Sequence, residues 1–489
     1  MSMLSTRGAA AVSESMAILR GLAPDGGLYV PEDFPHFSME DIAALGALNY
    51  QARALAILQK FLPDFTADEL KNAIAGAYGA GFDDADIAPV RPVGDWAHVL
   101  ELWHGPTLAF KDMALQILPY LLTTSAKKTV DGKQIAILVA TSGDTGKAAL
   151  EGFKDVDGTS ISVFYPEDGV SKMQKRQMTT QEGKNVNVCA VKGNFDDCQN
   201  GVKAIFTDKA IADRLAKNNI LLSSANSINW GRLAPQIVYY VSTYAELLKN
   251  KEIEYGEKIN VVVPTGNFGN ILAAYYAKLM GIPVNKLICA SNSNNVLTDF
   301  INTGVYDRNR KFYTTVSPSM DILISSNLER LLYHVTGSDA EVAGLMKSLA
   351  ENGSYTVRPE TLAAIQETFA CGWSSEKEVA GEIRARYEQD GYLCDTHTAV
   401  AFHVAAQKKR SGVPMVVLST ASPFKFPRSV LEALGRTAPE NDFEAMQQLE
   451  AAAGHAAPAS LAALRQKAER FNTVIDPAQI AEVALGYQA

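Results

Sequence analysis

The chain has 489 residues, enough for two or three domains with sizeable cores. Its formal net charge is −9 and it contains no long run of Lys and Arg, which argues against a nucleic-acid-binding protein. The five cysteines form no C-x-x-C pair, and the seven histidines show no H-E-x-x-H spacing. Neither a disulfide framework nor a metal site is therefore predicted.

The start of the chain lacks the basic and apolar segments of a signal peptide. No apolar run approaches the ~20 residues that are needed to span a bilayer. We therefore expect a cytoplasmic protein with no membrane partner.

The first ~90 residues combine a Gly- and Pro-rich turn region at 22–28 with amphipathic helical patterns at 39–61 and 67–76. This composition differs from the rest of the chain. It predicts a separate N-terminal domain at residues 1–92.

Short runs that are apolar almost throughout recur along the middle of the chain, each followed by a turn and a helical pattern. Such runs indicate strands that are buried on both faces. Their alternation with helices predicts right-handed βαβ units and parallel sheets, hence an α/β region at 93–430. A mostly helical pattern indicates an insertion at 305–390 and a helical C-terminal segment at 431–489. The predicted strands are 134–141, 160–165, 186–191, 259–264, 286–290 and 414–420.

Functional residues of open α/β sheets gather beyond the carboxyl ends of the strands, so the turns that follow these strands are candidates. The turn at 265–270 contains two glycines and opens a helical run, a combination that suits a phosphate group. A plain strand-to-helix turn that uses glycine for tightness remains the alternative.

Two further turns carry polar residues. Residues 141–146 supply hydroxyls, glycines and Asp144, which can surround a carboxylate or phosphate, or Asp144 can instead cap a helix. Lys425 lies between two phenylalanines at 419–426, where it is either a buried cation for an anionic ligand or a lysine whose stem covers apolar neighbours.

Lys111 lies in an apolar helical pattern within residues 101–115. A desolvated lysine has a lowered pKa and becomes a nucleophile that can form a Schiff base. The pattern alone leaves open an exposed lysine at the edge of a helix.

Several segments resemble motifs of the threonine synthase family, and they occur in the family's order between about residue 6 and residue 426. Residues 105–112 resemble its pyridoxal-lysine motif G-P-T-x-A-F-K-D. The other similar segments are 6–8 (T-R-G), 21–31 (G-L-A-P-D-G-G-L-Y-V-P), 141–146 (T-S-G-D-T-G), 223–229 (S-A-N-S-I-N) and 266–270 (G-N-F-G-N).

The resemblance implies a two-subdomain α/β fold of the tryptophan-synthase-β type (fold type II), with pyridoxal 5'-phosphate in the cleft. Lys111 would be the catalytic residue that carries the cofactor, and Thr420 would face the pyridine nitrogen. The residues implied to hold the cofactor phosphate are Gly266, Asn267, Phe268, Gly269 and Asn270.

The family's pattern also implies substrate contacts. Thr141, Ser142, Asp144 and Thr145 would lie near the substrate carboxylate, with Asp144 orienting the loop rather than touching the anion. Asn226 and Ser227 are further candidate contacts. Motif position and charge favour Ser171, Asn229, Arg232 and Lys425 for the substrate phosphate, since guanidinium and ammonium groups suit a dianion. Ser422 departs from the pattern, since many family members have His there.

The implied reaction converts O-phospho-L-homoserine and water to L-threonine and phosphate, carried out by a monomer or homodimer. One alternative is a pyridoxal-dependent phospholyase or dehydratase that releases 2-oxobutanoate; another is a non-catalytic ligand-binding homologue. The segment 21–31 and Asp144 favour the threonine synthase reaction. A nucleotide-binding dehydrogenase is disfavoured because no G-x-G-x-x-G follows a strand.

Overall fold

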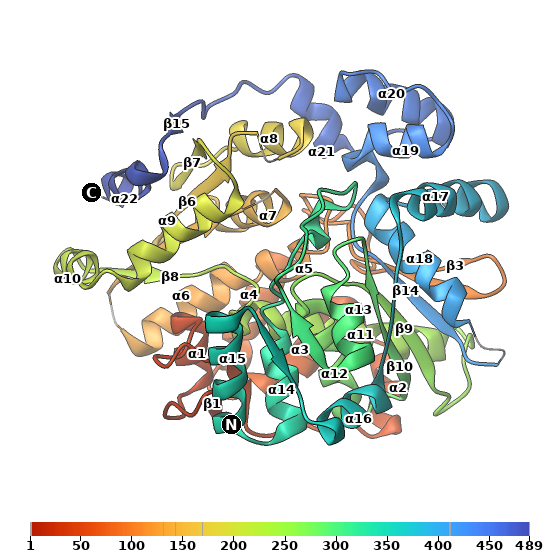
Figure 1. The fold of residues 1–489 in the computed structure, drawn as a ribbon, viewed down its shortest axis with the longest axis horizontal. Helices are drawn as coiled ribbons and strands as arrows, with labels where there is room; N and C mark the ends of the chain where they lie inside the picture. The colour runs from red at the N-terminus through yellow and green to blue at the C-terminus, as the bar shows by residue number, and fades with distance from the viewer. Residues whose placement is uncertain (1, 131, 142, 169, 410–411, 489) are drawn as a thin grey trace.

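The chain folds around two separate sheets, one toward the upper left and one toward the lower right of the view in Figure 1. The computed structural model describes residues 2–488 except 131, 142, 169, 410 and 411. Polar loops at the carboxyl ends of both sets of strands face one another and form the site described below.

The N-terminal domain contains a small antiparallel sheet and four helices. The predicted helix at 39–61 is two helices, because the chain turns at Gly46 and the Asn49 side chain caps the second one. The elements are β1 (Met3–Ser5), α1 (Glu14–Arg20), β2 (Tyr29–Pro31), α2 (Met39–Leu45), α3 (Tyr50–Phe61) and α4 (Ala67–Ala77).

The larger sheet has six strands in the order β13-β10-β9-β14-β4-β3. Neighbouring strands are parallel except for the β3–β4 hairpin. Its strands are β3 (Val90–Val93), β4 (Ala97–Glu101), β9 (Ile259–Pro264), β10 (Val284–Ser291), β13 (Phe369–Trp373) and β14 (Met415–Ser419). The helices that pack on it include α11 (Trp230–Lys249), α12 (Gly269–Leu279), α13 (Val296–Thr303) and α18 (Thr396–Lys408).

The segment at 305–390, predicted as a helical insertion, is not purely helical. It also contains the β11–β12 pair, and its strand β13 forms an edge of the six-stranded sheet. Its elements are β11 (Val305–Asp307), the 3₁₀ turn Pro318–Met320, α14 (Leu328–Thr336), α15 (Asp339–Asn352), β12 (Ser354–Thr356), α16 (Pro359–Thr368) and α17 (Glu376–Asp390).

The smaller sheet has five parallel strands in the order β15-β7-β6-β5-β8. Its strands are β5 (Gln134–Ala140), β6 (Thr159–Pro166), β7 (Val186–Val191), β8 (Ile220–Ser223) and β15 (Val474–Ile475). The helices in this part of the chain are α5 (Asp112–Leu115), α6 (Leu118–Thr129), α7 (Asp144–Phe153), α8 (Lys172–Thr179), α9 (Phe195–Thr207) and α10 (Lys209–Lys217).

The C-terminal segment connects the two halves of the molecule. It leaves the larger sheet through helices, crosses the top of the view in Figure 1 and adds β15 to the smaller sheet. The predicted helical segment thus also supplies a strand. Its other elements are the 3₁₀ turns Pro423–Lys425, Ala463–Arg465 and Pro477–Gln479, and α19 (Pro427–Ala433), α20 (Asp442–Ala453), α21 (Ala459–Ala462) and α22 (Ile480–Gln488).

The six predicted strands are all present, with ends that differ by at most two residues. They are buried almost throughout, as β9 illustrates with all six of its residues buried. Continuous apolar runs therefore indicated parallel strands covered on both faces, and the predicted fold class is confirmed.

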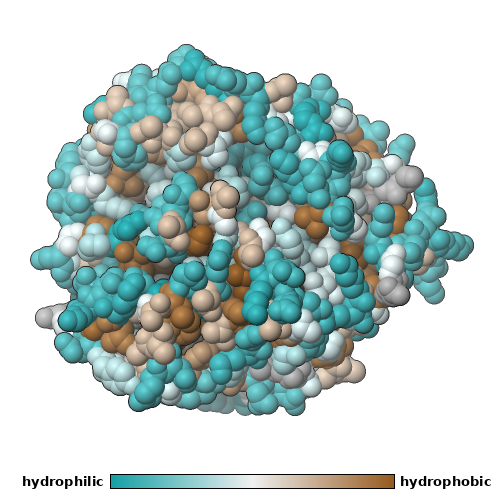
Figure 2. Space-filling model, turned by 180° about the vertical axis from the view of Figure 1, so that it is seen from behind, coloured by the Kyte–Doolittle hydropathy of each residue, from teal (hydrophilic) through white to brown (hydrophobic). Residues whose placement is uncertain are grey.

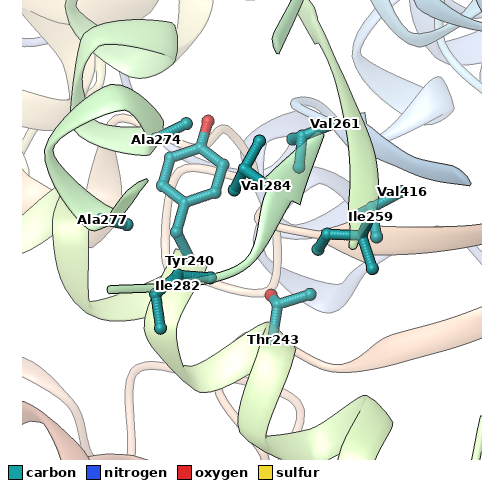
Figure 3. A pocket seen from close by; sticks show the side chains of 9 residues that line it. All are labelled: Tyr240, Thr243, Ile259, Val261, Ala274, Ala277, Ile282, Val284 and Val416. Atoms are coloured by element: carbon teal, nitrogen blue, oxygen red, sulfur yellow. The ribbon is translucent and has the colours of Figure 1, made fainter. Parts of the chain in front are cut away.

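A small apolar cavity lies between α11, α12 and the larger sheet (Figure 3). Ile259 and Val284, at the beginnings of β9 and β10, line it, so it faces away from the carboxyl ends of these strands. Its other walls are apolar except for Thr243 and Tyr240. Since an anionic ligand needs several polar partners, this cavity is not the candidate site.

The surface seen from behind is mostly hydrophilic, and hydrophobic residues form separate patches on it (Figure 2). Among the helices of the described residues, none is both long and apolar enough to cross a bilayer.

Gly152 on α7 packs against the backbone of α5, and a Cβ there would overlap the carbonyl oxygen of Leu115. We expect G152A to lower the free energy of unfolding by about 1–3 kcal/mol, because the two helices must separate to relieve the overlap. Gly381 on α17 is a matched control, since a Cβ there meets no atom within 4 Å. G381A should raise the midpoint of thermal unfolding slightly and G152A should lower it; equal midpoints would contradict the close packing of α5 and α7.

Candidate active site

Lys111 lies where the two halves of the molecule meet. After β4 the chain runs along the end of β14, where Phe110 donates its N–H to the carbonyl of Thr420 over 2.8 Å. Asp112 holds this loop, because its carboxylate accepts both the N–H and the hydroxyl of Thr107 at 2.8 Å. A Cβ on Gly105 would lie 2.6 Å from the Asp112 side chain, so only glycine allows this clasp.

The half-buried Lys111 side chain lies in a positively charged neighbourhood. Burial lowers the pKa of Lys111 to about 8; the charge of Arg232 and, less strongly, that of Lys425 lower it too, while Asp144 opposes them. A substantial fraction of the amine is therefore neutral near physiological pH. A neutral, desolvated amine is the form that can attack a carbonyl or accept a proton.

Residues 266–270 form an anion cradle between β9 and α12. Among the described residues, none accepts the backbone N–H groups of 266–270, and they lie at the positive end of α12. Phe268 has a left-handed backbone with φ 64°.

The Asn270 side chain extends this cradle. Its Oδ1 accepts the hydroxyls of Tyr239 and Tyr240 at 2.6 Å each, which fixes the orientation of the amide. Its buried Nδ2 has no acceptor among the described residues. An anion is the group that would satisfy this donor and the neighbouring N–H groups together.

Hydrogen bonds within the loop at 141–146 fix its shape. Thr141 Oγ1 accepts the N–H groups of Gly143 and Gly146, at 3.0 and 2.9 Å. Ser142, predicted as a substrate contact, lies outside the described residues. The half-buried Thr145 side chain makes no hydrogen bond to a described residue, so Thr145 keeps a hydroxyl for a ligand.

Asp144 at the start of α7 joins the two halves of the molecule. Its Oδ1 lies 2.7 Å from the ammonium of Lys425, which follows β14, and both side chains are buried. Lys425 also donates to the carbonyl of Thr107 over 2.9 Å. Although burial acts to raise it, Lys425 holds the pKa of Asp144 well below its usual range. Lys425 is thus a buried cation whose partner in the structure is Asp144, and its predicted role toward an anionic ligand stays a prediction.

A second set of contacts to Asp144 involves residues that no sequence motif indicated. Ser319, from the 3₁₀ turn Pro318–Met320, donates its hydroxyl to Asp144 Oδ2 over 3.2 Å and its N–H to Nε2 of His397 over 3.2 Å. His397 is buried, and its Nδ1 lies 2.7 Å from the buried carboxylate of Asp395. His397 follows a helix-capping Asp, a pattern that by itself indicates only a helix start.

Arg232 has unused donors in this site. It is buried, and Nη1 donates to the carbonyl of Ala225 over 2.8 Å, while Nε has no partner among the described residues. Burial lowers the pKa of Arg232 to about 10. The partly exposed Asn226 and Ser227 lie on the loop just before it.

Asn229 and Ser171, predicted as phosphate contacts, act here as helix caps. Asn229 accepts the N–H of Gly231 and donates to the carbonyls of Ile18 and Ser224, so its amide is saturated by backbone groups. Ser171 caps α8 through Gln174.

Two residues lie at the end of β14. Thr420 is buried, with its N–H donated to Thr398 Oγ1 over 3.3 Å. Ser422 has a buried hydroxyl without a partner in the described part of the chain.

Three family models match the chain. They are "Threonine synthase N terminus" at residues 2–78, "Pyridoxal-phosphate dependent enzyme" at 98–421 and "Threonine synthase, C-terminal" at 398–484. The threonine synthase of Pseudomonas aeruginosa is 39% identical over 488 residues, which cover 99% of this chain and 97% of that protein. The chain belongs to the threonine synthase family.

Solved structures agree with this assignment. The crystal structure of pyridoxal-phosphate-bound threonine synthase from Brucella melitensis superposes with a TM-score of 0.89 at 40% identity, covering 100% of this chain and 99% of that one. The yeast threonine synthase structure has a TM-score of 0.88 at 33% identity, covering 99% and 97%. The predicted family, fold class and cofactor are confirmed.

Some relatives are longer than this chain. Threonine synthase-like 1 of Homo sapiens is 42% identical over 431 residues, which cover 86% of this chain and 58% of that protein. This chain thus spans little more than half the length of those relatives.

The site fits the cofactor of the threonine synthase family. The unpaired N–H groups and the Asn270 amide suit a phosphate, and the buried Lys111 amine suits an aldehyde. Lys111, Arg232 and Lys425 form a cluster of cations in which Lys425 pairs with Asp144 and also lies near Asp112, while Arg232 forms no ion pair with a described carboxylate. Buried charge of one sign is costly unless an ion of opposite sign neutralises it, and phosphate groups are such ions.

The cofactor-free chain should react with pyridoxal phosphate faster as pH rises, with a midpoint near pH 8, because only the neutral form of Lys111 attacks the aldehyde. In D144N the midpoint should move to lower pH, since the Asp144 charge raises the pKa of Lys111. The rate at each pH is measured from the absorbance change after pyridoxal phosphate is added to the wild type. The change seen in K111A is subtracted to correct for the reaction of other lysines. A midpoint near the ordinary lysine value of 10.5 would contradict the effect of burial.

Proposed function

We propose that the chain converts O-phospho-L-homoserine and water to L-threonine and phosphate. One observation carries the proposal: the half-buried Lys111 lies in a cluster of cations with Arg232 and Lys425 at the junction of the two sheets, and Arg232 forms no ion pair with a described carboxylate. A doubly anionic substrate and a phosphate-bearing cofactor would together neutralise that cluster.

Lys111 would carry the cofactor, and residues 266–270 with the Asn270 amide would hold its phosphate. Thr420 is the residue for the pyridine nitrogen; a hydroxyl there moderates the electron withdrawal that a carboxylate would strengthen. When bound, pyridoxal phosphate supplies an electron sink for negative charge that develops next to the substrate amine.

Lys111 would also move the protons. An amine with a pKa of about 8 accepts a proton at neutral pH and returns it without a large energy cost. The charge of Arg232 keeps the amine partly neutral, and Asp144 limits that effect. The reaction needs a proton removed from the α-carbon and then from the β-carbon, and Lys111 is the base we assign to both.

The substrate anions need separate anchors. For the phosphate we propose Arg232, whose Nε is unpaired among the described residues, with Asn226 and Ser227 beside it. For the carboxylate we propose Thr145 and the backbone of its loop. Lys425 would contribute its charge while it remains paired with Asp144.

The first test incubates the purified chain with O-phospho-L-homoserine and follows phosphate, threonine and 2-oxobutanoate together. We expect one threonine for each phosphate, and a loss of turnover of at least about 10³-fold in K111A, because Lys111 is the base assigned to both carbons. Phosphate accompanied by 2-oxobutanoate would instead make the enzyme a phospholyase. Absence of turnover in a wild-type chain that binds the cofactor would show that O-phospho-L-homoserine is not the substrate.

The second test concerns Arg232. R232A should raise KM for phosphohomoserine by about tenfold or more, because a charge-assisted contact to phosphate is lost. The cofactor content and absorbance spectrum should be unchanged, and R232K should recover part of the affinity. An unchanged KM in R232A would remove Arg232 from the substrate site.

A further inference from the structure

Arg330 on α14 is fully buried and forms no ion pair with a described carboxylate. Its guanidinium instead donates in three directions: Nε to the carbonyl of Tyr29 at 2.8 Å, Nη1 to Oδ1 of Asn327 at 2.5 Å and Nη2 to the carbonyl of Ile228 at 2.6 Å. The three acceptors lie in the N-terminal domain, in the segment leading into α14 and in the loop before α11.

Asn327 connects Arg330 to the anion cradle through hydrogen bonds. Because Arg330 occupies Oδ1, the amide presents Nδ2 to the carbonyl of Asn267 at 3.0 Å and to Ser227 Oγ at 3.5 Å. The N–H of Asn327 donates to the same Asn267 carbonyl over 3.1 Å. Asn267 belongs to the cradle, and Ser227 to the loop assigned to the substrate.

Ile228 connects Arg330 to the loop before α11, on the other side of the site. It directly precedes Asn229, which caps α11, and Arg232 lies within the first turn of that helix. The bond from Arg330 to the Ile228 carbonyl therefore fixes the loop that sets the start of α11.

The N-terminal domain docks at the same place. Next to Arg330, the carboxylate of Glu329 accepts the Thr6 hydroxyl at 2.6 Å and two bonds from Arg7 at 2.8 and 2.7 Å. Thr6, Arg7 and Tyr29 belong to the two N-terminal motifs, at 6–8 and 21–31, which are given no role in the proposed reaction. Their contacts explain them as a docking surface for α14.

We propose that Arg330 is a positioning residue that aligns the anion cradle and the substrate loop with each other only when the N-terminal domain is docked. A buried guanidinium without a carboxylate partner is tolerated only if its donors find acceptors. It therefore holds the three segments in one arrangement. This proposal rests on the proposed function for the identity of the two loops.

The test compares R330M with R53M in the full-length holoenzyme. Arg53 is a matched control: it is also buried, it donates to the carbonyls of Leu45 and Gly46, and it joins the N-terminal domain to α11 through Ser242 and Glu246. It contacts neither site loop. The measurements are the midpoint of thermal unfolding, the dissociation constant of pyridoxal phosphate and hydrogen exchange in peptides covering 224–232 and 262–270.

We expect both variants to lower the unfolding midpoint, whereas only R330M raises the cofactor dissociation constant, by about tenfold or more, and speeds exchange in both peptides. R330K should share this defect, because an ammonium cannot reach three divergent acceptors. If R330M does not fold, N327A removes the side-chain bonds to Asn267 and Ser227 and the acceptor of Arg330 Nη1, and should weaken cofactor binding in the same way.

Equal effects of R330M and R53M on cofactor binding would overturn the proposal, as would wild-type cofactor affinity in R330M or R330K. Cofactor dissociation and hydrogen exchange need no substrate. They therefore decide on Arg330 even if O-phospho-L-homoserine proves to be the wrong substrate.

Discussion

The excess of buried positive charge at the junction of the two sheets is the constraint on which the site depends. Lys425 pairs with Asp144 and lies near the Asp112 carboxylate, whereas Arg232, beside Lys111, forms no ion pair with a described carboxylate. Each cation comes from a segment that follows a strand, so the parallel arrangement of the strands brings them together. Burying like charges is costly, and the protein retains them because anionic groups of cofactor and substrate are their partners. The same charges keep Lys111 partly neutral, so one electrostatic arrangement provides both binding and reactivity.

The ion pair between Asp144 and Lys425 also has a mechanical consequence. Asp144 belongs to the smaller sheet's half of the molecule and Lys425 to the larger sheet's half, so their contact holds the cleft together. Ser319 strengthens this contact from a third segment, and the buried pair of His397 and Asp395 holds Ser319 in place. Any movement that opens the cleft must separate a buried ion pair, which favours a closed site around the reacting groups.

The anion cradle is rigid for a different reason. Its N–H groups have no acceptors among the residues that the structure describes, so the surrounding residues must hold the backbone in place. Two tyrosine hydroxyls fix the Asn270 amide from the side of α11, and Asn327 holds the Asn267 carbonyl from the side of α14. Because folding already orders this backbone, less conformational entropy is lost when a ligand binds.

The sequence by itself determined the strands, the loops that follow them and the position of Lys111. Apolar runs such as 134–140 and 259–264 indicate buried parallel strands in any context, and glycine-rich turns after them must gather at one edge. The α/β class and the candidate loops could therefore be predicted from these patterns, whereas the fold type and the cofactor were implied by the resemblance of segments such as 105–112 to threonine synthase motifs. Short or weakly patterned strands such as β3 and β13 could not be predicted, because their polar and small residues resemble those of loops and helices.

Only the tertiary structure decided which partner each buried polar group has. Asn229 and Ser171 lie in motifs that suggested phosphate contacts, yet backbone groups saturate Asn229 and both residues cap helices. Conversely, nothing local distinguishes His397, Asn327 or Arg330 from ordinary helix residues. Their roles depend on acceptors and donors as far as 301 residues away along the chain, as in the bond from Arg330 to Tyr29. Local sequence sets backbone conformation and burial, but a hydrogen-bond partner from a distant segment exists only once the chain has folded.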